Sequence, residues 1–163
     1  MAKCLVTGGA GFIGSHIVDR LVAEGHQVRV YDDLSTGKRE NLAHLEPKIE
    51  LILGDIREKD ALQKAANGVD HVFHVAAIRA VLRSVDDPRE ANDVNVTGTL
   101  NVLLAAKEAR AKRVIFTSSS AVYGETEKFP SQESDCPKPQ SPYGASKIMG
   151  EYYCQIFTKL YGL

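Results

Sequence analysis

A glycine-rich segment close to the N-terminus restricts the fold more than any other feature of this sequence. Gly8, Gly11 and Gly14 follow a short apolar run, Lys3–Thr7, and precede a helical pattern of apolar residues. Glycine lets the backbone turn tightly and approach a pyrophosphate without a Cβ atom in the way. The free N–H groups at the start of the following helix favour the same anion. A strand, a G-x-x-G-x-x-G turn and a helix in this order predict a dinucleotide site.

Apolar runs rich in β-branched residues alternate with helical patterns along the rest of the chain. We expect strands at Lys3–Thr7, Gln27–Tyr31, Ile49–Leu53, His71–Val75 and Arg113–Thr117. We expect helices near 12–24, 38–45, 58–67, 88–110 and 142–161. Short strands that are apolar throughout are typical of parallel sheets buried on both faces, and strand–helix alternation implies right-handed crossovers. The sequence therefore predicts an α/β fold, a Rossmann-type doubly wound parallel sheet that stops after the last of these helices.

Turn and cap residues support several of these boundaries. Gly25 follows the first helical stripe, as a C-terminal stop should. Asp87 and Ser141 each stand before a proline, which gives an N-cap and a first-turn proline to the helices that follow. The longest irregular stretch is 118–140, and a loop of that length in a compact domain is usually functional.

A carboxylate ends the second predicted strand, about 20 residues after the glycines, where a ribose-binding acid is expected. Asp32 at this position would accept hydrogen bonds from a ribose 2′-OH and repel a 2′-phosphate. It therefore favours NAD over NADP. The alternative is a solvated turn carboxylate beside a flexible loop.

A tyrosine and a lysine four residues apart begin the last predicted helix. Tyr143 and Lys147 would lie on one face of it. An apolar stripe centres about 120° away from that face and consists of Met149, Tyr152, Tyr153, Ile156 and Leu160. We expect the stripe to pack and the Tyr143–Lys147 face to be free for chemistry. A phenol ionises at about pH 10, and a nearby ammonium and a positively charged nicotinamide both favour its use as a base. The alternative is a helix-start tyrosine beside a solvated lysine.

Serines follow the fifth predicted strand, in the run Thr117-Ser118-Ser119-Ser120. Ligand-contacting residues of a doubly wound sheet collect at the carboxyl ends of its strands. A serine hydroxyl there would form a hydrogen bond with the substrate oxygen that the tyrosine deprotonates. The alternative is a serine-rich turn without a role in binding. Because these features occur together and in this order after a dinucleotide loop, they favour a catalytic site.

Composition limits the possible partners. The 163 residues suit one domain with a single core. A net charge of −1 gives no basic footprint for nucleic acid, and no apolar run approaches the roughly 20 residues of a membrane span. No signal peptide is visible, and the widely spaced Cys4, Cys136 and Cys154 suit a reducing cytoplasm. His71 and His74 point to opposite faces of a strand, so we expect no metal.

Taken as a set, the motifs resemble the extended short-chain dehydrogenase/reductase family, and within it the NAD-dependent nucleotide-sugar 4-epimerases acting on UDP-glucose or UDP-N-acetylglucosamine. The resemblance covers essentially the whole chain. Its motifs are T-G-G-A-G-F-I-G (7–14), D-D-L-S-T-G-K-R-E-N-L (32–42), G-D-I-R (54–57), F-H-V-A-A (73–77), N-V-T-G-T (95–99), T-S-S-S-A-V-Y-G (117–124) and S-P-Y-G-A-S-K (141–147). The resemblance implies NAD as cofactor and a UDP-sugar as substrate.

The resemblance also implies a role for each matching residue. The NAD pyrophosphate would be held by Gly8, Gly11, Phe12, Ile13 and Gly14. The adenosine ribose would lie along Asp32, Asp33, Ser35, Thr36 and Gly37. Adenine would lie between Asp55 and Ile56, and the rest of the cofactor above Val75, Ala76 and Ala77, with Asn95 close by.

Three residues would carry the chemistry in such an enzyme. Tyr143 would accept the proton, and Lys147 would bond the nicotinamide ribose and tune Tyr143. Counting back from V-Y-G selects Ser119 as the catalytic serine, with Ser120 the second choice.

Two positions bear on the reaction class that the resemblance implies. Sugar dehydratases of the family usually carry an Asp-Glu pair just after the catalytic threonine, and the decarboxylases usually carry a Glu one place before V-Y-G. Ser120 and Ala121 occupy these positions, which argues against elimination and decarboxylation. The reaction that remains is epimerisation, in which the sugar is oxidised to a 4-keto sugar and hydride returns to its other face. The stretch 78–88 resembles that of enzymes for UDP-N-acetylhexosamines or UDP-hexuronates more than that of a strict UDP-glucose enzyme. Arg79 and Arg83 in this stretch would face either the substrate or solvent.

Family members continue beyond the point where this chain ends, into a part that closes over the sugar. We therefore expect residues 1–163 to be one NAD-binding Rossmann domain that lacks the C-terminal substrate-binding part and has weak or no epimerase activity. The edge beside the fifth strand would be unprotected, and a homodimer through the helices near 88–110 and 142–161 is possible. Two alternatives stay open: a non-catalytic NAD-binding module, and an NAD-dependent dehydrogenase or reductase for another carbonyl compound.

Overall fold

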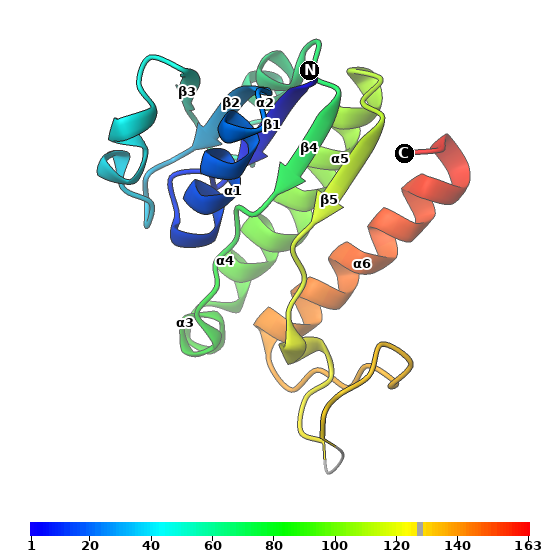
Figure 1. The fold of residues 1–163 in the computed structure, drawn as a ribbon. Coiled ribbons are helices and arrows are strands. Elements are labelled where there is room, and N and C mark those ends of the chain that lie inside the picture. The colour runs from blue at the N-terminus through cyan, green and yellow to red at the C-terminus, as the bar shows by residue number, and fades with distance from the viewer. Residues whose placement is uncertain (127–128) are drawn as a thin grey trace.

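The chain folds around one parallel five-stranded sheet (Figure 1). A computed structural model describes residues 1–126 and 129–163. The strands are β1 (Lys3–Thr7), β2 (Gln27–Asp32), β3 (Ile49–Leu53), β4 (His71–His74) and β5 (Arg113–Phe116). Their order is β3-β2-β1-β4-β5, and all neighbours are parallel. The order reverses between β1 and β4, which is the switch point of a doubly wound Rossmann-type sheet. The expected fold class is confirmed, and each strand end lies within one residue of its predicted position.

The connecting segments are mainly helical. They are α1 (Phe12–Ala23), η1 (Arg39–Leu45, a 3₁₀ helix), α2 (Lys59–Ala66), α3 (Val81–Asp86), α4 (Pro88–Asn92), η2 (Asp93–Thr97, a π-helix), α5 (Gly98–Glu108), η3 (Ser120–Val122, a 3₁₀ helix) and α6 (Pro142–Tyr161). The predicted caps are confirmed, since Asp87 accepts from the Glu90 N–H and Ser141 from the Gly144 N–H. Gly25 ends α1 with a left-handed φ of 80°.

Alternate residues of the central strands supply two cores, one on each face of the sheet. Leu5 and Val72 pack with residues of α2 and α5. Val6 and Val30 pack with residues of α1 and η1 on the other face. Figure 1 shows α1 in front of the sheet and α5 behind it. The central strands are therefore buried on both faces, as their apolar sequences predicted.

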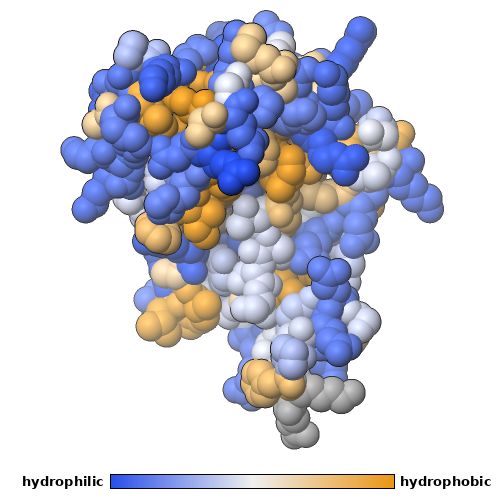
Figure 2. All heavy atoms as spheres, in the orientation of Figure 1, coloured by the Kyte–Doolittle hydropathy of each residue, from blue (hydrophilic) through white to orange (hydrophobic). Residues whose placement is uncertain are grey.

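The sheet is less well covered at β5, which forms one of its edges as expected. Ile115 of β5 lies opposite Phe73 of β4 on the α1 side and is exposed. Figure 2 shows hydrophobic residues reaching this face of the molecule at several separate places among hydrophilic ones. In the described part of the chain, no helix is long and apolar enough to cross a membrane.

Three predicted features need correction. The segment expected to be one helix over 88–110 contains a π-helical turn, η2, between α4 and α5. The helix α3 was not predicted. Within the stretch 118–140, which was predicted to be irregular, η3 forms a short 3₁₀ turn, while residues 127 and 128 of that stretch lie outside the described residues.

Candidate active site and cofactor site

The glycine loop lies where β1 meets α1, packed against the end of β4. Gly8 has a φ of 69°, and a Cβ atom there would lie 2.6 Å from the backbone nitrogen of Ala76. A Cβ atom on Gly14 would overlap the carbonyl oxygen of Gly8. Only glycine fits these two positions, because the obstacle in each case is backbone, which cannot move aside as a flexible side chain can.

The first turn of α1 is open towards solvent. Its N-cap is Gly11, in extended conformation, and none of the described side chains caps it. Phe12 and Ile13 are exposed, so the helix begins at the surface. The first N–H groups of a helix have no intrahelical acceptor and carry its positive dipole end. This arrangement suits the pyrophosphate of a dinucleotide, as predicted.

Asp32 joins the glycine loop to the turn that follows β2. The buried carboxylate accepts hydrogen bonds from the N–H of Ala10 at 2.9 Å and from the N–H of Leu34 at 2.8 Å. Burial raises the pKa of Asp32, and the two backbone hydrogen bonds partly offset this shift. Gly37 lies against the same carboxylate. Each carboxylate oxygen accepts one bond here and can accept another, which fits the ribose role proposed for Asp32.

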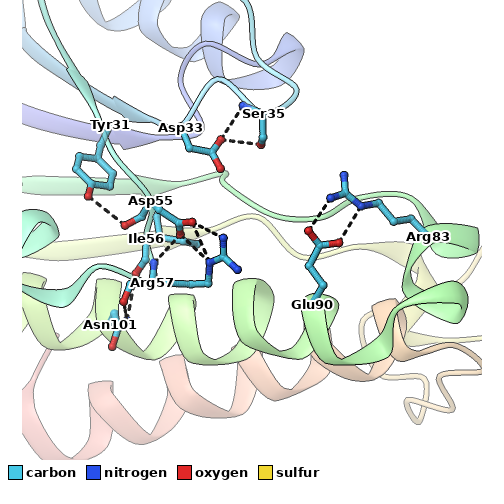
Figure 3. A network of polar contacts seen from close by, with 9 residues as sticks. All are labelled: Tyr31, Asp33, Ser35, Asp55, Ile56, Arg57, Arg83, Glu90 and Asn101. Carbon is cyan, nitrogen blue, oxygen red and sulfur yellow. Dashed lines mark hydrogen bonds and ion pairs between the residues drawn. The ribbon is translucent and has the colours of Figure 1, made fainter.

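The residues expected along the ribose and adenine lie at the carboxyl ends of β2 and β3 (Figure 3). Asp33 accepts hydrogen bonds from the N–H and the hydroxyl of Ser35, and both residues are exposed, as is Thr36. Asp55 is bonded to the guanidinium of Arg57, which lowers the pKa of this carboxyl. The Asp55 carboxylate therefore has a cationic partner within the chain.

Ile56 follows β3 and points into the core. Its side chain is buried in the core, close to Gly98 of α5, rather than facing the surface. Its carbonyl oxygen accepts a hydrogen bond from the Asn101 amide (Figure 3). Gly98 allows this close approach, because a Cβ atom at that position would lie 2.5 Å from the end of the Ile56 side chain, which would then have to move. We therefore infer that any contact of Ile56 with adenine involves its backbone.

The segment Val75–Ala77 runs beside the glycine loop. The N–H groups of Val75 and Ala76 both donate to the carbonyl oxygen of Thr7, at 3.1 and 3.0 Å. This extends the contact between β1 and β4 beyond the end of the sheet. The structure thus brings the segment expected to lie beneath the cofactor next to the loop expected to hold its pyrophosphate.

Asn95 projects from the π-helix η2 towards α6. Its amide oxygen accepts from the Ile78 N–H at 2.8 Å, and its amide nitrogen donates to the Ile78 carbonyl and the Ser146 hydroxyl, both at 3.0 Å. Both amide hydrogens are therefore engaged within the protein. Asn95 ties the segment after β4 to the helix that carries Tyr143.

Tyr143 and Lys147 come together at the start of α6, as predicted. Lys147 Nζ lies 5.8 Å from the centroid of the Tyr143 ring and donates to the Thr117 carbonyl at 2.8 Å. Burial lowers the pKa of Lys147 to about 8. The backbone N–H of Tyr143 donates to the hydroxyl of the fully buried Ser84, at 3.1 Å. Helix α3 thus fixes the position of the tyrosine.

The three serines after β5 differ in their surroundings. Ser118 bonds the carboxylate of Glu151, and Ser120 is exposed. Ser119 accepts a hydrogen bond from the Ala121 N–H at 3.2 Å. Among the described residues it acts as an acceptor, so its hydroxyl hydrogen is available to a ligand. Ser119 therefore remains the better candidate of the three.

The prediction for the packing of α6 was wrong. The apolar stripe is largely exposed, with exposed fractions of 43% for Met149, 48% for Tyr152 and 47% for Ile156. The face that carries Tyr143 and Lys147 is the buried one. Small residues explain the difference: a Cβ atom on Gly150 would overlap the ring of Phe116 in β5. The glycine allows α6 to pack closely on the sheet with its less apolar face.

The polar partners of the site were missed by sequence reasoning. Ser84 and Glu151 contact the site through hydrogen bonds, but neither belongs to a recognisable local motif. Arg83, which was considered as a substrate contact, forms an ion pair with Glu90 at 2.7 Å (Figure 3). Gly144 and Gly150 were the available signal for close packing of α6, because glycines inside a helix usually have a packing reason.

Comparison with known proteins places this chain in a family. Residues 4–163 match the model of the NAD dependent epimerase/dehydratase family. The chain belongs to that family. A UDP-glucose 4-epimerase of Mycolicibacterium smegmatis is 45% identical over 99% of this chain and 53% of its own length.

Solved structures give the same result. A UDP-N-acetylglucosamine 4-epimerase of Methanobrevibacter ruminantium, in complex with UDP-N-acetylmuramic acid, has a TM-score of 0.94 at 43% identity, covering 99% of this chain and 52% of its own. A UDP-glucose 4-epimerase of Thermus thermophilus in complex with NAD has a TM-score of 0.93 at 42% identity, with the same coverage. The chain spans about half the length of these relatives. NAD is the cofactor of this family, and the glycine loop, the open start of α1 and Asp32 fit it.

Proposed function

We propose that this chain is the NAD-binding, catalytic half of a nucleotide-sugar 4-epimerase. The observation that supports this most directly is the placement of Lys147, whose buried ammonium lies beside Tyr143 and is held at the carboxyl end of β5. An ammonium there stabilises negative charge that develops on the phenol oxygen. A binding module without chemistry has no need of this pair.

The proposed roles follow from the positions of the side chains. Bound NAD would supply the chemistry of accepting a hydride from C4 of the sugar and returning it. Tyr143 would take the proton of the 4-hydroxyl group and give it back. Ser119 would donate a hydrogen bond to the same oxygen with the hydroxyl hydrogen described above. Lys147 would bond the nicotinamide ribose while keeping its place beside Tyr143.

The choice of epimerisation over elimination rests on Ser120 and Ala121. Both follow Ser119, and neither carries an acid that could protonate a leaving hydroxyl or assist loss of a carboxylate. The family description covers epimerases and dehydratases alike, so these two positions decide the proposal. A UDP-sugar is the proposed substrate class, because the relatives named above are UDP-sugar epimerases.

The domain organisation is also part of the proposal. Residues 1–163 would form the cofactor domain, and the sugar would be bound mainly by a part that corresponds to the half of the relatives not matched by these residues. Without that part the sugar is poorly positioned and water is not excluded. We therefore expect weak or no epimerase activity from this chain.

Calorimetry tests the proposal first. NAD is titrated into the purified chain, and UDP-glucose and UDP-N-acetylglucosamine follow. We expect NAD to bind and the UDP-sugars to bind weakly or not at all. Failure to bind NAD would contradict the assignment of an autonomous cofactor domain.

Turnover is tested in a chimera in which the second half of the Mycolicibacterium smegmatis relative follows residue 163. The chimera should interconvert UDP-glucose and UDP-galactose. Its Tyr143→Phe variant should bind NAD and show no turnover, whereas a Tyr123→Phe variant controls for the loss of a phenol elsewhere in the site region. Turnover by the Tyr143→Phe variant at the parent rate would refute the role of the base.

We also propose a homodimer through the exposed stripe of α6, together with α5. The stripe places Met149, Tyr152 and Ile156 at the surface in one row, and contiguous exposed apolar surface marks a contact site. Light scattering of the chain and of an Ile156→Glu variant tests this. A dimer that persists in the variant would place the contact elsewhere.

A further inference from the structure

A histidine lies fully inside the protein between the glycine loop and the π-helix. His74 ends β4 and is 2% exposed. Its Nδ1 lies 2.7 Å from the hydroxyl of Thr7, the last residue of β1, and its Nε2 lies 2.9 Å from the hydroxyl of Thr99 in α5. Both nitrogens of the ring are therefore used, and neither is directed to solvent.

The partners determine which nitrogen carries the proton. Thr99 donates its single hydroxyl hydrogen to the Asn95 carbonyl, at 2.5 Å. Its oxygen can therefore only accept from His74, which requires a hydrogen on Nε2. In a neutral ring Nδ1 then has no hydrogen and accepts from the hydroxyl of Thr7. The bonds run in one direction, from Thr7 to His74, from His74 to Thr99, and from Thr99 to Asn95.

A positive charge on the His74 ring, in addition to that of Lys147, would disrupt this chain of hydrogen bonds. A protonated ring would direct an Nδ1–H at Thr7, which would have to reverse its hydroxyl. Lys147 is the charged group near His74: its Nζ lies 5.0 Å from the centroid of the Phe116 ring, which itself contacts the His74 ring at 5.7 Å. Burial and the Lys147 charge both lower the pKa of His74, to about 3. The ring thus stays neutral beside the catalytic ammonium.

We propose that His74, as the neutral Nε2–H tautomer, is a positioning residue that couples the glycine loop to the catalytic helix. On one side it holds Thr7, which adjoins Gly8 of the glycine loop. On the other side it holds Thr99 and, through Thr99, the carbonyl of Asn95. The Asn95 amide bonds Ser146, whose hydroxyl donates to the Tyr143 carbonyl at 2.7 Å.

The coupling has a consequence for cofactor binding. The residues proposed to hold the pyrophosphate and those proposed to move the proton share one buried, fully bonded network, which is rigid because each member has its partner. Breaking a bond at Thr99 leaves a buried N–H without an acceptor and loosens the glycine loop at the opposite side of the ring. His74 thus acts on NAD affinity through Thr7. The inference depends on NAD binding and not on epimerase activity.

Nitrogen NMR of the histidine-labelled chain without cofactor is the first test. We expect the His74 signals of a neutral ring with Nε2 protonated, and no titration between pH 8 and about pH 5. An Nδ1–H tautomer, or protonation above about pH 5, would overturn the proposal. This measurement needs neither NAD nor a variant that folds, so it is independent of the proposed function.

A double-mutant cycle tests the coupling itself. Thr7→Val, Thr99→Val and the double variant are compared by their NAD dissociation constants. We expect each single change to raise the constant by about tenfold and the double variant to raise it by far less than the product. The two hydroxyls bond opposite nitrogens of one ring, so non-additivity would report transmission through His74.

Three controls complete the cycle. Thr99→Ser keeps the hydroxyl and should bind NAD as the parent does. Thr97→Val changes an exposed threonine at the end of the adjoining π-helix η2 and should also bind NAD as the parent does. In a His74→Phe background the effects of the two valine changes should become additive. Additive effects in the parent background would overturn the coupling, while the NMR result would still report the tautomer.

Discussion

The ammonium group of Lys147 lies 2.8 Å from the carbonyl oxygen of Thr117, at the carboxyl end of β5. The lysine side chain is nearly buried, with 4% of its surface exposed. A buried cation loses the solvation that it has in water, and one carbonyl replaces only part of it. The low pKa of about 8 records this loss. The fold therefore keeps a destabilising charge at the position proposed to contact the cofactor, which is typical of functional sites.

Replacing Lys147 by methionine should stabilise the protein at pH 7. The native pKa of about 8 lies below the ordinary value of 10.5, so the unfolded chain binds more protons between these values. Stability of the parent should rise from pH 8 to 10.5, by at most about 1.4 kcal/mol per pH unit. At pH 7 the Lys147→Met variant should be more stable by about 2 kcal/mol. Urea unfolding at pH 7 and pH 9.5 measures both effects.

The exposed Lys159 of the same helix supplies the control for that comparison. Lys159→Met should change stability by less than about 0.5 kcal/mol at either pH. The Lys147→Met variant should also bind NAD more weakly, since it loses the proposed ribose contact. An unchanged pH dependence in Lys147→Met would show that the parent lysine is not the titrating group.

Gly14→Ala should weaken NAD binding strongly, while Gly68→Ala should not affect it. The Cβ atom added at position 14 would overlap the Gly8 carbonyl, so the glycine loop must shift. We expect NAD affinity to fall by more than about tenfold, or at least about 1.4 kcal/mol. Gly68 has a φ of +70° and nothing within 4 Å of a Cβ atom. Its alanine variant should lose about 1 kcal/mol of stability through backbone strain alone. Calorimetry with NAD and thermal unfolding separate the two outcomes.

Asp32→Asn should weaken NAD binding more than Asp33→Asn. The carboxylate of Asp32 accepts one N–H on each oxygen, and an amide would direct its own N–H groups at one of them. The loop loses a hydrogen bond and the ribose loses its anion, so we expect about a tenfold rise in the NAD dissociation constant. Asp33 is exposed, and the single oxygen of an asparagine amide there can still accept hydrogen bonds from the N–H and the hydroxyl of Ser35. A larger effect of Asp33→Asn than of Asp32→Asn would reassign the ribose contact to Asp33.

The strands, the glycine loop and the Tyr143–Lys147 pair could be predicted because their signals are local. The run Lys3–Thr7 is apolar throughout, and the spacing of Gly8, Gly11 and Gly14 is readable without knowledge of the fold. The four-residue spacing of Tyr143 and Lys147 places them on one helix face wherever the helix packs. Fold class and candidate chemistry therefore follow from segments of a few residues.

The remaining features depend on contacts between distant parts of the chain. The hydrogen bonds of His74 reach Thr7 and Thr99, which are 67 and 25 residues away. The sequence indicated only that His74 and His71 cannot both bind one metal ion. The π-helix η2 widens one turn of a regular helical pattern at Asn95, whose partners Ile78 and Ser146 lie outside that helix, and a pattern with a period of 3.6 residues does not reveal it. The packing of α6 was misjudged because apolar residues were counted while Gly150, which permits the close approach to Phe116, was not.

The neutral state of His74 predicts a specific loss of stability in mild acid. Its native pKa of about 3 lies below the ordinary value of 6.5. Between these two pH values His74 is protonated in the unfolded chain and neutral in the native protein. The stabilising contribution is complete above about pH 6.5 and falls on acidification, by at most about 1.4 kcal/mol per pH unit. A His74→Gln variant retains a donor and an acceptor but has no titrating group. The difference in unfolding free energy between parent and variant should therefore shrink steadily from pH 7 to pH 5, because carboxylates titrate alike in both and cancel. A constant difference over that range would mean that His74 titrates in the folded protein as it does in the unfolded chain, and a difference that grows on acidification would mean that its folded ring is charged.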